Sequence, residues 1–315
     1  MTAPSAHLRV LVLVGPTASG KSDIALVLAR LLKGEIVSAD ARQIYRGMDC
    51  GTAKPSHRDR TAVPHHMIDI RYPHESYSAA AFAREGREAV AAILGAGALP
   101  LIVGGSGLYV RALVDGLSRV PASDPEVRTV LQDRLQAEGL AELVRELERV
   151  DPHGAARMDT RNPRRVLRAL EVHRTTGIPL SRFQLLAPEQ PPFTSVFFGM
   201  KREREDLYRR IDLRCDRMLE EGLLEETRSL LASGVPAGAP ALAAPGYAEA
   251  LRYLEGEISR DEMVRLFKQS SRRYARRQMT WFGRDRRIWW MEVEKETPPG
   301  ETARAIADGF LQGGI

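Results

Sequence analysis

The residues with the clearest chemistry lie in one short stretch near the start of the chain, GPTASGKS, which covers residues 15–22. Its pattern, G-x-x-x-x-G-K-[ST], is typical of a phosphate-binding loop, in which backbone N–H groups turn toward an anion. Lys21 adds a mobile positive charge, and the Ser22 hydroxyl can ligate Mg²⁺. The motif therefore predicts a site that holds a phosphate group, but it does not say which compound carries that phosphate.

The segments on both sides of this loop fit the interpretation. Residues 8–14 form an apolar run that predicts a short buried strand, and residues 23–32 predict an amphipathic helix whose N-terminus would face the anion. A strand, a loop and a helix in this order are the context that a phosphate-binding loop requires. The alternative is a glycine-rich turn that matches the pattern by chance.

Two further side chains that can do chemistry follow predicted strands. The stretch EIVSAD ends in Asp40, and the apolar stretch LPLIVGG is followed by Ser106. Ligands of parallel sheets bind at the carboxyl ends of the strands, so Asp40 would lie beside the phosphate-binding loop, where it could act as a general base or bind a metal. The alternatives are that Asp40 caps the turn after it and that Ser106 is a structural residue of a glycine-rich turn.

Residues 265–287 form the most basic part of the chain, with nine basic residues and one acidic residue. On a helix, arginines four positions apart share a face, so this segment predicts a surface that binds a polyanion such as nucleic acid. The alternative is a solvated surface helix. The arginine pairs are Arg272 with Arg276 and Arg273 with Arg277. The aromatic residues of the segment recur every seven positions and are expected in the core: Phe267, Tyr274 and Trp281.

Composition and element order predict the domain organisation. The chain has 315 residues, 43% hydrophobic and 28% charged, which suits a soluble protein of two domains. Strands alternate with helices over residues 1–120, which predicts the first part of an α/β core of the P-loop NTPase type, with a parallel sheet flanked by helices. Proline-rich breaks bound a helical insertion at residues 121–190, and residues 191–315 return to the core and form a helical C-terminal region.

The same data indicate where the protein works. Cys50 and Cys215 are the two cysteines, and their spacing suggests neither a disulfide framework nor a zinc site. A reducing, cytoplasmic compartment fits best. The apolar run at residues 8–14 is too short to cross a membrane, so no membrane partner is expected. We expect a monomer. On residues alone, the chain is a P-loop enzyme with an RNA or DNA partner.

Several motifs taken together resemble one known family, the tRNA dimethylallyltransferases, also called tRNA isopentenyltransferases. The resemblance covers nearly the whole chain, and the motifs occur in family order: GPTASGKS, SADARQIYRGMDCGTAKP, HHMIDI, PLIVGGSGLYVRAL, DPEVR, NPRRVLRALEV and YARRQMTWF. It implies transfer of a dimethylallyl group from dimethylallyl diphosphate to N6 of the adenosine immediately 3′ of the anticodon in tRNA. Diphosphate is released and Mg²⁺ assists. The alternatives are a P-loop small-molecule kinase and an RNA-stimulated ATPase.

The resemblance also implies roles for individual residues. The residues expected in catalysis are Asp40 as the base, Ser106, Lys21 and Arg128. Those expected to bind the diphosphate are Gly15, Pro16, Thr17, Ala18, Ser19, Gly20, Lys21, Ser22 and Arg214, with Arg210 as an alternative to Arg214 and Ser22 as the metal ligand.

Contacts to the tRNA anticodon stem-loop are expected from six parts of the chain, and the helical insertion is expected to clasp that stem-loop from one side. The residues are Asp40, Ala41, Arg42, Gln43, Ser106, Arg128, Arg164, Arg165, Val166, Leu167, Arg168, Ala244, Pro245, Gly246, Tyr247, Ala248, Glu249, Arg276, Arg277, Gln278, Met279, Thr280, Trp281, Phe282 and Gly283.

Overall fold

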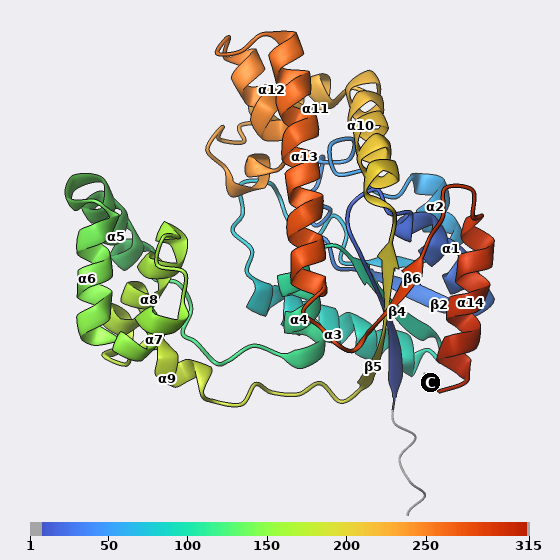
Figure 1. Ribbon diagram of the computed structural model, residues 1–315, viewed down its shortest axis with the longest axis horizontal. Coiled ribbons are helices and arrows are strands. Elements are labelled where there is room, and N and C mark those ends of the chain that lie inside the picture. Colours follow the sequence, from blue (N-terminus) through green and yellow to red (C-terminus); the bar gives the residue numbers. More distant parts are fainter. Residues whose placement is uncertain (1–7, 314–315) are drawn as a thin grey trace, which may run out of the picture. The chain divides into compact units, whose positions relative to one another are not determined.

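The computed structural model describes residues 8–313. In this part of the chain, the residues separate into two compact units, one of which is Asp115–Gln190. The larger unit is built from the segments before and after it (Figure 1). No helix within residues 8–313 is long and apolar enough to cross a membrane.

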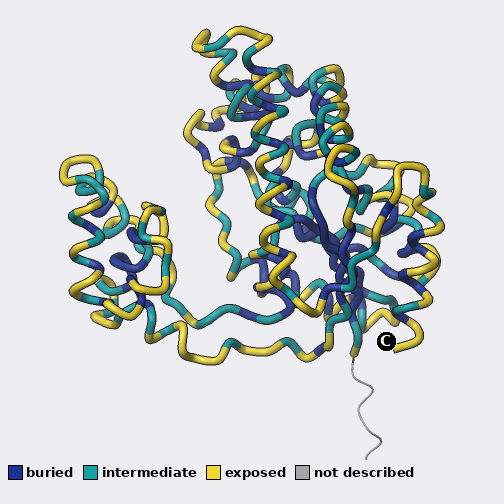
Figure 2. The backbone as a smooth tube through the Cα atoms, in the orientation of Figure 1, coloured by how far each residue is buried: buried dark blue, intermediate teal, exposed yellow. Residues whose placement is uncertain are grey.

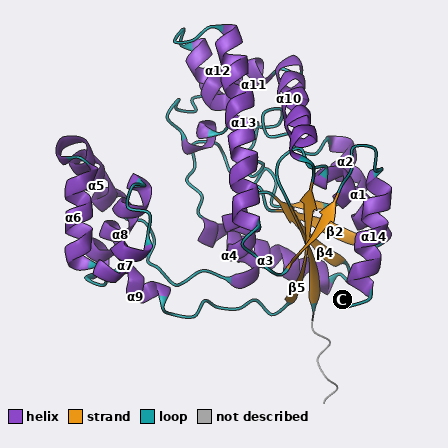
Figure 3. Cartoon of the chain, in the orientation of Figure 1, coloured by secondary structure: helices purple, strands orange, loops and turns teal. Residues whose placement is uncertain are grey.

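The centre of the larger unit is a six-stranded sheet in which every neighbouring pair is parallel, in the order β3-β2-β4-β1-β5-β6 (Figure 3). The expected parallel α/β sheet flanked by helices is therefore confirmed. The strands are β1 Arg9–Val14, β2 Gly34–Ser38, β3 His65–His66, β4 Leu99–Gly104, β5 Thr194–Lys201 and β6 Ile288–Glu292.

The sequence of β1 explains its central position. All of its residues after Arg9 are buried, and successive side chains point to opposite faces of the sheet. Val10, Val12 and Val14 belong to one hydrophobic cluster, whereas Leu11 and Leu13 belong to another. Both faces of the sheet are thus covered by helices, which is why the strand is a continuous apolar run (Figure 2).

Helices cover both faces of this sheet and continue into a helical C-terminal region. Helices α10 and α13 pack together, as do α12 and α13, and α1 packs against α14 (Figure 1). The helices of the larger unit are α1 Lys21–Leu31, α2 His57–Ala62, α3 Ala79–Gly95, α4 Gly107–Asp115, α10 Arg204–Glu220, α11 Leu223–Ala232, the 3₁₀ helix η1 Pro240–Ala243, α12 Tyr247–Leu254, α13 Arg260–Phe282 and α14 Pro299–Leu311.

The smaller unit is helical and has its own core, which includes Leu131, Leu143, Leu147, Val166 and Leu170. Three of its helices begin with a capping residue followed by proline: the Asp124 side chain accepts from the N–H of Glu126, Asp151 from that of Gly154, and Asn162 from that of Arg164. Its helices are α5 Pro125–Glu138, α6 Leu140–Val150, α7 Pro152–Arg157, α8 Pro163–Thr176 and α9 Leu180–Gln184.

One expectation about α13 is wrong. Phe267 is buried, but Trp281 is 41% exposed, so the aromatic residues do not form a continuous core stripe. At this end of the helix the next residue, Phe282, takes the buried position, and the Trp281 side chain lies beside Gly107. The buried face instead includes two polar residues, and its members are Met263, Phe267, Ser271, Ala275, Gln278 and Phe282.

Candidate active site

The phosphate-binding loop connects β1 to α1, so the N-terminus of α1 faces the anion position that the motif predicts. The loop has an unusual backbone. Gly15 has φ 145°, and a Cβ there would lie 2.8 Å from the carbonyl oxygen of Met200. Gly20, just before α1, is left-handed with φ 95°. Because only glycine adopts these conformations readily, the shape of the loop requires glycine at both positions.

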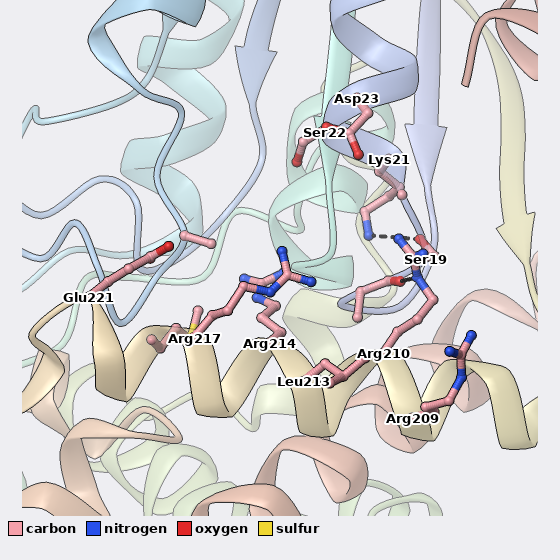
Figure 4. Close-up of a pocket in the computed structure, with 14 residues that line it drawn as sticks. Ser19, Lys21, Ser22, Asp23, Arg209, Arg210, Leu213, Arg214, Arg217 and Glu221 are labelled. Carbon is pink, nitrogen blue, oxygen red and sulfur yellow. Dashed lines mark hydrogen bonds between the residues drawn. The ribbon is translucent and has the colours of Figure 1, made fainter. Parts of the chain in front are cut away.

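A pocket of about 360 Å³ opens between this loop and α10 (Figure 4). Arg210, Arg214 and Arg217 lie on one face of α10 and line it, and Lys21 lines it from the start of α1. Acidic residues at the pocket are Asp23 and Glu221. The excess of positive charge suits a ligand with several negative charges, such as a diphosphate.

The surroundings of Lys21 disfavour its positive charge. Its Nζ donates to the carbonyl oxygen of Pro16 at 2.5 Å and to Ser19 Oγ at 3.4 Å. Burial, together with the positive charge of Arg214, lowers the pKa of Lys21 to about 7, and the carboxylate of Asp40 opposes this shift. An anion between Lys21 and Arg214 would relieve the repulsion between them.

The arginines of this region are anchored by backbone carbonyl groups. Arg210 Nε donates to the carbonyl oxygen of Ala18 at 2.9 Å, and Arg202 Nε donates to that of Ser19 at 3.1 Å, so both brace the loop. Arg214 donates to the carbonyl oxygen of Thr52 at 3.4 Å, and burial lowers its pKa. Figure 4 shows Arg214 rising from α10 toward Lys21. Both Arg210 and Arg214 line the pocket, but Arg210 is tied to the loop backbone.

Asp40 lies after the end of β2, and its two carboxylate oxygens differ. Oδ1 accepts the N–H of Arg42 at 2.8 Å and that of Gln43 at 3.4 Å, so Asp40 does cap the turn that follows it. None of the hydrogen bonds among residues 8–313 uses Oδ2. The carboxylate can therefore hold the turn with one oxygen and accept a proton with the other.

Ser106 connects the ends of two strands. Its Oγ accepts the N–H of Ala41 at 2.9 Å, while its own N–H donates to the carbonyl oxygen of Ala39 at 3.2 Å. Ser106 therefore has the structural role that the sequence left as the alternative. Tyr274 lies near Asp40 and Ser106: burial raises the pKa of its hydroxyl to about 12, the negative charge of Asp40 adds to this effect, and the Ser106 side chain opposes it. Nothing in the sequence indicated this position, since Tyr274 was expected in the core.

Several residues expected to contact tRNA are engaged inside the larger unit. Arg42 donates to the carbonyl oxygen of Pro240 at 2.6 Å, and Gln43 Oε1 accepts from Ser38 Oγ at 2.9 Å. Buried side chains cannot reach a ligand on the surface, so they support the residues around them. Those buried in this way are Ala244, Tyr247, Gln278 and Phe282. Exposed positions on or next to α13 are Arg276, Arg277, Thr280, Trp281 and Gly283.

One residue expected at the diphosphate is also engaged elsewhere. The N–H of Thr17 donates to Gln278 Oε1 at 2.8 Å, so this N–H does not face the pocket's ligand space. Gly15 and Pro16 likewise are not among the pocket residues, although Pro16 holds Lys21. The residues of the motif that do line the pocket are Ala18, Ser19, Gly20, Lys21 and Ser22.

In the smaller unit, the expected arginines are arranged around Glu171, whose side chain is 2% exposed. Arg128 lies 3.7 Å from Glu171 Oε2, and Arg168 lies 3.3 Å from Oε1 and also donates to the carbonyl oxygen of Pro121. Arg164 and Arg165 are exposed. The neighbouring residues Val166 and Leu167 are buried in the core of this unit.

Glu226, on α11, is a residue that the sequence did not single out. Its carboxylate accepts three consecutive backbone N–H groups, from Asp49 at 2.8 Å, Cys50 at 2.8 Å and Gly51 at 3.1 Å. The hydroxyl of Tyr247 also donates to it. The turn that Glu226 holds leads directly to Thr52, whose carbonyl oxygen accepts from Arg214. The carboxylate therefore fixes the turn that anchors Arg214, a residue that lines the pocket.

The fold and the site together define an α/β protein with a glycine-rich loop of the phosphate-binding type and, beside it, a pocket with an excess of positive charge. The family model described as "IPP transferase" matches residues 43–286. The chain is 46% identical to tRNA dimethylallyltransferase 1 of Trichlorobacter lovleyi, over 94% of this chain and 98% of that protein. It is 49% identical to tRNA dimethylallyltransferase of Geobacter metallireducens, over 90% and 92%. The chain belongs to the IPP transferase family.

Solved structures agree with this assignment. The full-length tRNA isopentenylpyrophosphate transferase from Bacillus halodurans matches with a TM-score of 0.73 and 36% identity, covering 98% of this chain and 96% of that one. A eukaryotic dimethylallyltransferase acting on tRNA matches with a TM-score of 0.81 and 25% identity, covering 96% of this chain and 79% of that one. The similarity thus extends over both compact units.

The role of Glu226 can be tested by Glu226→Gln. The amide cannot replace a charged acceptor for three N–H groups, and hydrogen bonds to charged groups contribute about 1.5–3 kcal/mol, so we expect a decrease of about that size in the free energy of unfolding. Urea denaturation measures it. The matched control is Glu225→Gln, which removes an exposed ion pair with Arg228 and should cost less than about 1 kcal/mol. Equal decreases in the two variants would contradict the assignment.

Proposed function

We propose that this chain transfers a dimethylallyl group from dimethylallyl diphosphate to N6 of the adenosine immediately 3′ of the anticodon in tRNA. Membership of the family and the names of its relatives support this activity. The observation that carries it is the cationic pocket beside the phosphate-binding loop. Asp40 does not line this pocket, but its negative charge acts on Lys21 and Arg214, which do. A diphosphate site and a carboxylate with one oxygen without a protein partner thus occur side by side.

The loop and the arginines would act on the leaving group. When the C–O bond of the donor breaks, negative charge grows on the departing diphosphate, and Lys21 and Arg214 stabilise it. The N–H groups at the start of α1 add to this stabilisation, since the first turn of a helix leaves them without intrahelical partners. Arg210 and Arg202 keep the loop in place through Ala18 and Ser19.

Mg²⁺ suits this site. The Ser22 hydroxyl lines the pocket at the start of α1, and Mg²⁺ often takes few protein ligands and completes its shell with phosphate oxygens and water. Within residues 8–313 no group of three or more histidine, cysteine or acidic residues forms a separate metal site. When bound, the ion would neutralise part of the diphosphate charge.

Asp40 would act on the acceptor. The exocyclic amine is a poor nucleophile because its lone pair is delocalised into the ring, so a base that takes its proton as the C–N bond forms assists the reaction. Oδ2 of Asp40 is available for this proton, and the Ser106 hydroxyl next to it can donate to the substrate. The adenine must leave its stack to reach the donor carbon, which costs least in a loop.

The exposed arginines of α13 would bind the tRNA backbone. Arg273, Arg276 and Arg277 are exposed on one helix, and no ion pair with an acidic residue involves them within residues 8–313. We also assign to tRNA the exposed Arg164 and Arg165 of the helical insertion, together with Arg128. The residues expected at tRNA that are buried act indirectly, by supporting this surface. Cytoplasmic location and a monomeric state stay predictions, the first supported by two free cysteines.

The decisive experiment incubates the protein with labelled dimethylallyl diphosphate, Mg²⁺ and an anticodon stem-loop that carries adenosine at the target position. We expect label in the RNA and release of one diphosphate for each group transferred. ATP-dependent phosphorylation of a small molecule, or RNA-stimulated ATP hydrolysis without transfer of label, would favour the two alternatives instead. Both are disfavoured because β4 ends in glycine and not in the carboxylate usual for ATP hydrolysis.

Asp40→Asn tests the base. Asparagine keeps the Oδ1 acceptor that caps the turn, so only the proton-accepting oxygen is removed. Turnover should fall by roughly 10²–10⁴-fold, the usual effect of removing a general base, while the Kd for the stem-loop stays the same. Asp308→Asn, on the exposed side of α14, is the control and should be unchanged. An Asp40→Asn variant with normal single-turnover rates would remove Asp40 from the chemistry.

Paired Arg276→Ala and Arg277→Ala substitutions test the RNA surface. For every phosphate that an arginine no longer neutralises, the slope of log K against log salt concentration should decrease by about one unit, and stem-loop binding should weaken. Titrations of the stem-loop at several salt concentrations measure the slope. Arg304→Ala, an exposed arginine of α14, serves as the control for net charge. If the paired variant and the control have the same slope, these arginines do not contact the phosphates.

A further inference from the structure

Gln278 differs from its neighbours on α13. It directly follows the exposed Arg276 and Arg277, yet it is only 5% exposed, and its amide lies against Thr17 and Gly105. Its Oε1 accepts the N–H of Thr17 at 2.8 Å, and its Nε2 donates to the carbonyl oxygen of Gly105 at 3.0 Å. One partner can only donate and the other can only accept, so this arrangement fixes the orientation of the amide.

Two glycines allow α13 to lie close to the backbone next to Gln278. A Cβ at Gly105 would lie 2.2 Å from Gln278 Nε2, and a Cβ at Gly107 would lie 2.2 Å from Trp281 Cδ1. Glycine at these two positions therefore lets α13 lie directly on the turn between β4 and α4. One turn earlier on the same face, Tyr274 lies near Ser106.

The two partners of Gln278 belong to the two loops that carry the site. Thr17 is in the phosphate-binding loop, four residues before Lys21, and Gly105 directly precedes Ser106. A single amide thus joins these loops to each other and to α13. Its bond to Thr17 also turns that N–H away from the ligand, which leaves the donors at the start of α1 to face it.

We propose that Gln278 is a positioning residue of the donor site and not a tRNA contact. By holding the Thr17 peptide and the turn at Gly105, it sets the shape of the phosphate-binding loop against the end of β4. Donor binding therefore depends on a residue of the helix whose opposite face binds RNA. This inference deepens the proposed function and rests on it.

Gln278→Met tests the inference, because methionine keeps the length and the helix propensity but cannot form either hydrogen bond. We expect the Kd for inorganic diphosphate with Mg²⁺ to rise about 5- to 50-fold, as the removal of two buried hydrogen bonds implies. The KM for dimethylallyl diphosphate should rise by a similar factor, with kcat affected less. The Kd for the stem-loop should stay within about twofold of the wild type.

Gln269→Met is the matched control, since Gln269 is an exposed glutamine of the same helix, and all of its constants should be unchanged. Gly105→Ala disturbs the same contact through the partner of Gln278: the added Cβ would displace the end of the Gln278 side chain, while the sequence of α13 is unchanged. It should reproduce the weaker diphosphate binding with stem-loop binding intact, and it keeps the test decisive if Gln278→Met does not fold.

Two results would overturn the inference. In the first, stem-loop binding weakens about tenfold while diphosphate binding is unchanged, which would make Gln278 an RNA contact. In the second, the thermal midpoint falls while the folded variants bind diphosphate like the wild type, which would make it a packing residue only. Failure of the proposed function is distinguishable, because the wild-type protein would then transfer no label, whereas diphosphate binding is measured without transfer.

Discussion

The structure depends on holding several positive charges close together around one loop. The acceptors that hold them are mostly neutral: Lys21 donates to Pro16, Arg210 to Ala18 and Arg214 to Thr52, each through a backbone carbonyl oxygen. A carbonyl group orients a cation without cancelling its charge. The repulsion between Lys21 and Arg214 therefore persists in the folded protein. An anionic ligand would be attracted by these charges, because the protein itself does not neutralise them.

A backbone carbonyl group can hold a cation in position only if the backbone segment that carries it is rigid. Two side chains far apart in sequence supply this rigidity. Glu226 gathers three N–H groups of the turn before Thr52, and Gln278 joins the phosphate-binding loop to the turn at Gly105. Elsewhere, arginines pair directly with carboxylates, as Arg134 does with Glu138 and Glu146. Arg134 is thus neutralised by ion pairs, whereas Lys21, Arg210 and Arg214 donate to neutral carbonyl groups around the loop.

These relations explain what could be predicted from the sequence. The loop at residues 15–22 is local, and the position of Asp40 follows from strand order, so both could be placed without coordinates. The bonds of Gln278 span 261 and 173 residues, and no periodicity reveals them. Trp281 was misplaced because its seven-residue spacing suggested the core. Strand β6 has only five residues, and the 13-residue helix α14 begins after Pro298; neither was identified as a separate element.

The charge pattern of α13 follows from the same constraint. Polar residues that face the site from this helix, Tyr274 and Gln278, are uncharged, whereas Arg273, Arg276 and Arg277 are exposed. A cation in place of Gln278 would add to the repulsion around Lys21, and a carboxylate would compete with the diphosphate for it. A neutral amide with one donor and one acceptor satisfies both loops and leaves the pocket's charge unchanged. The polyanion surface that we propose on one side of the helix is therefore compatible with the anion site that we propose on the other.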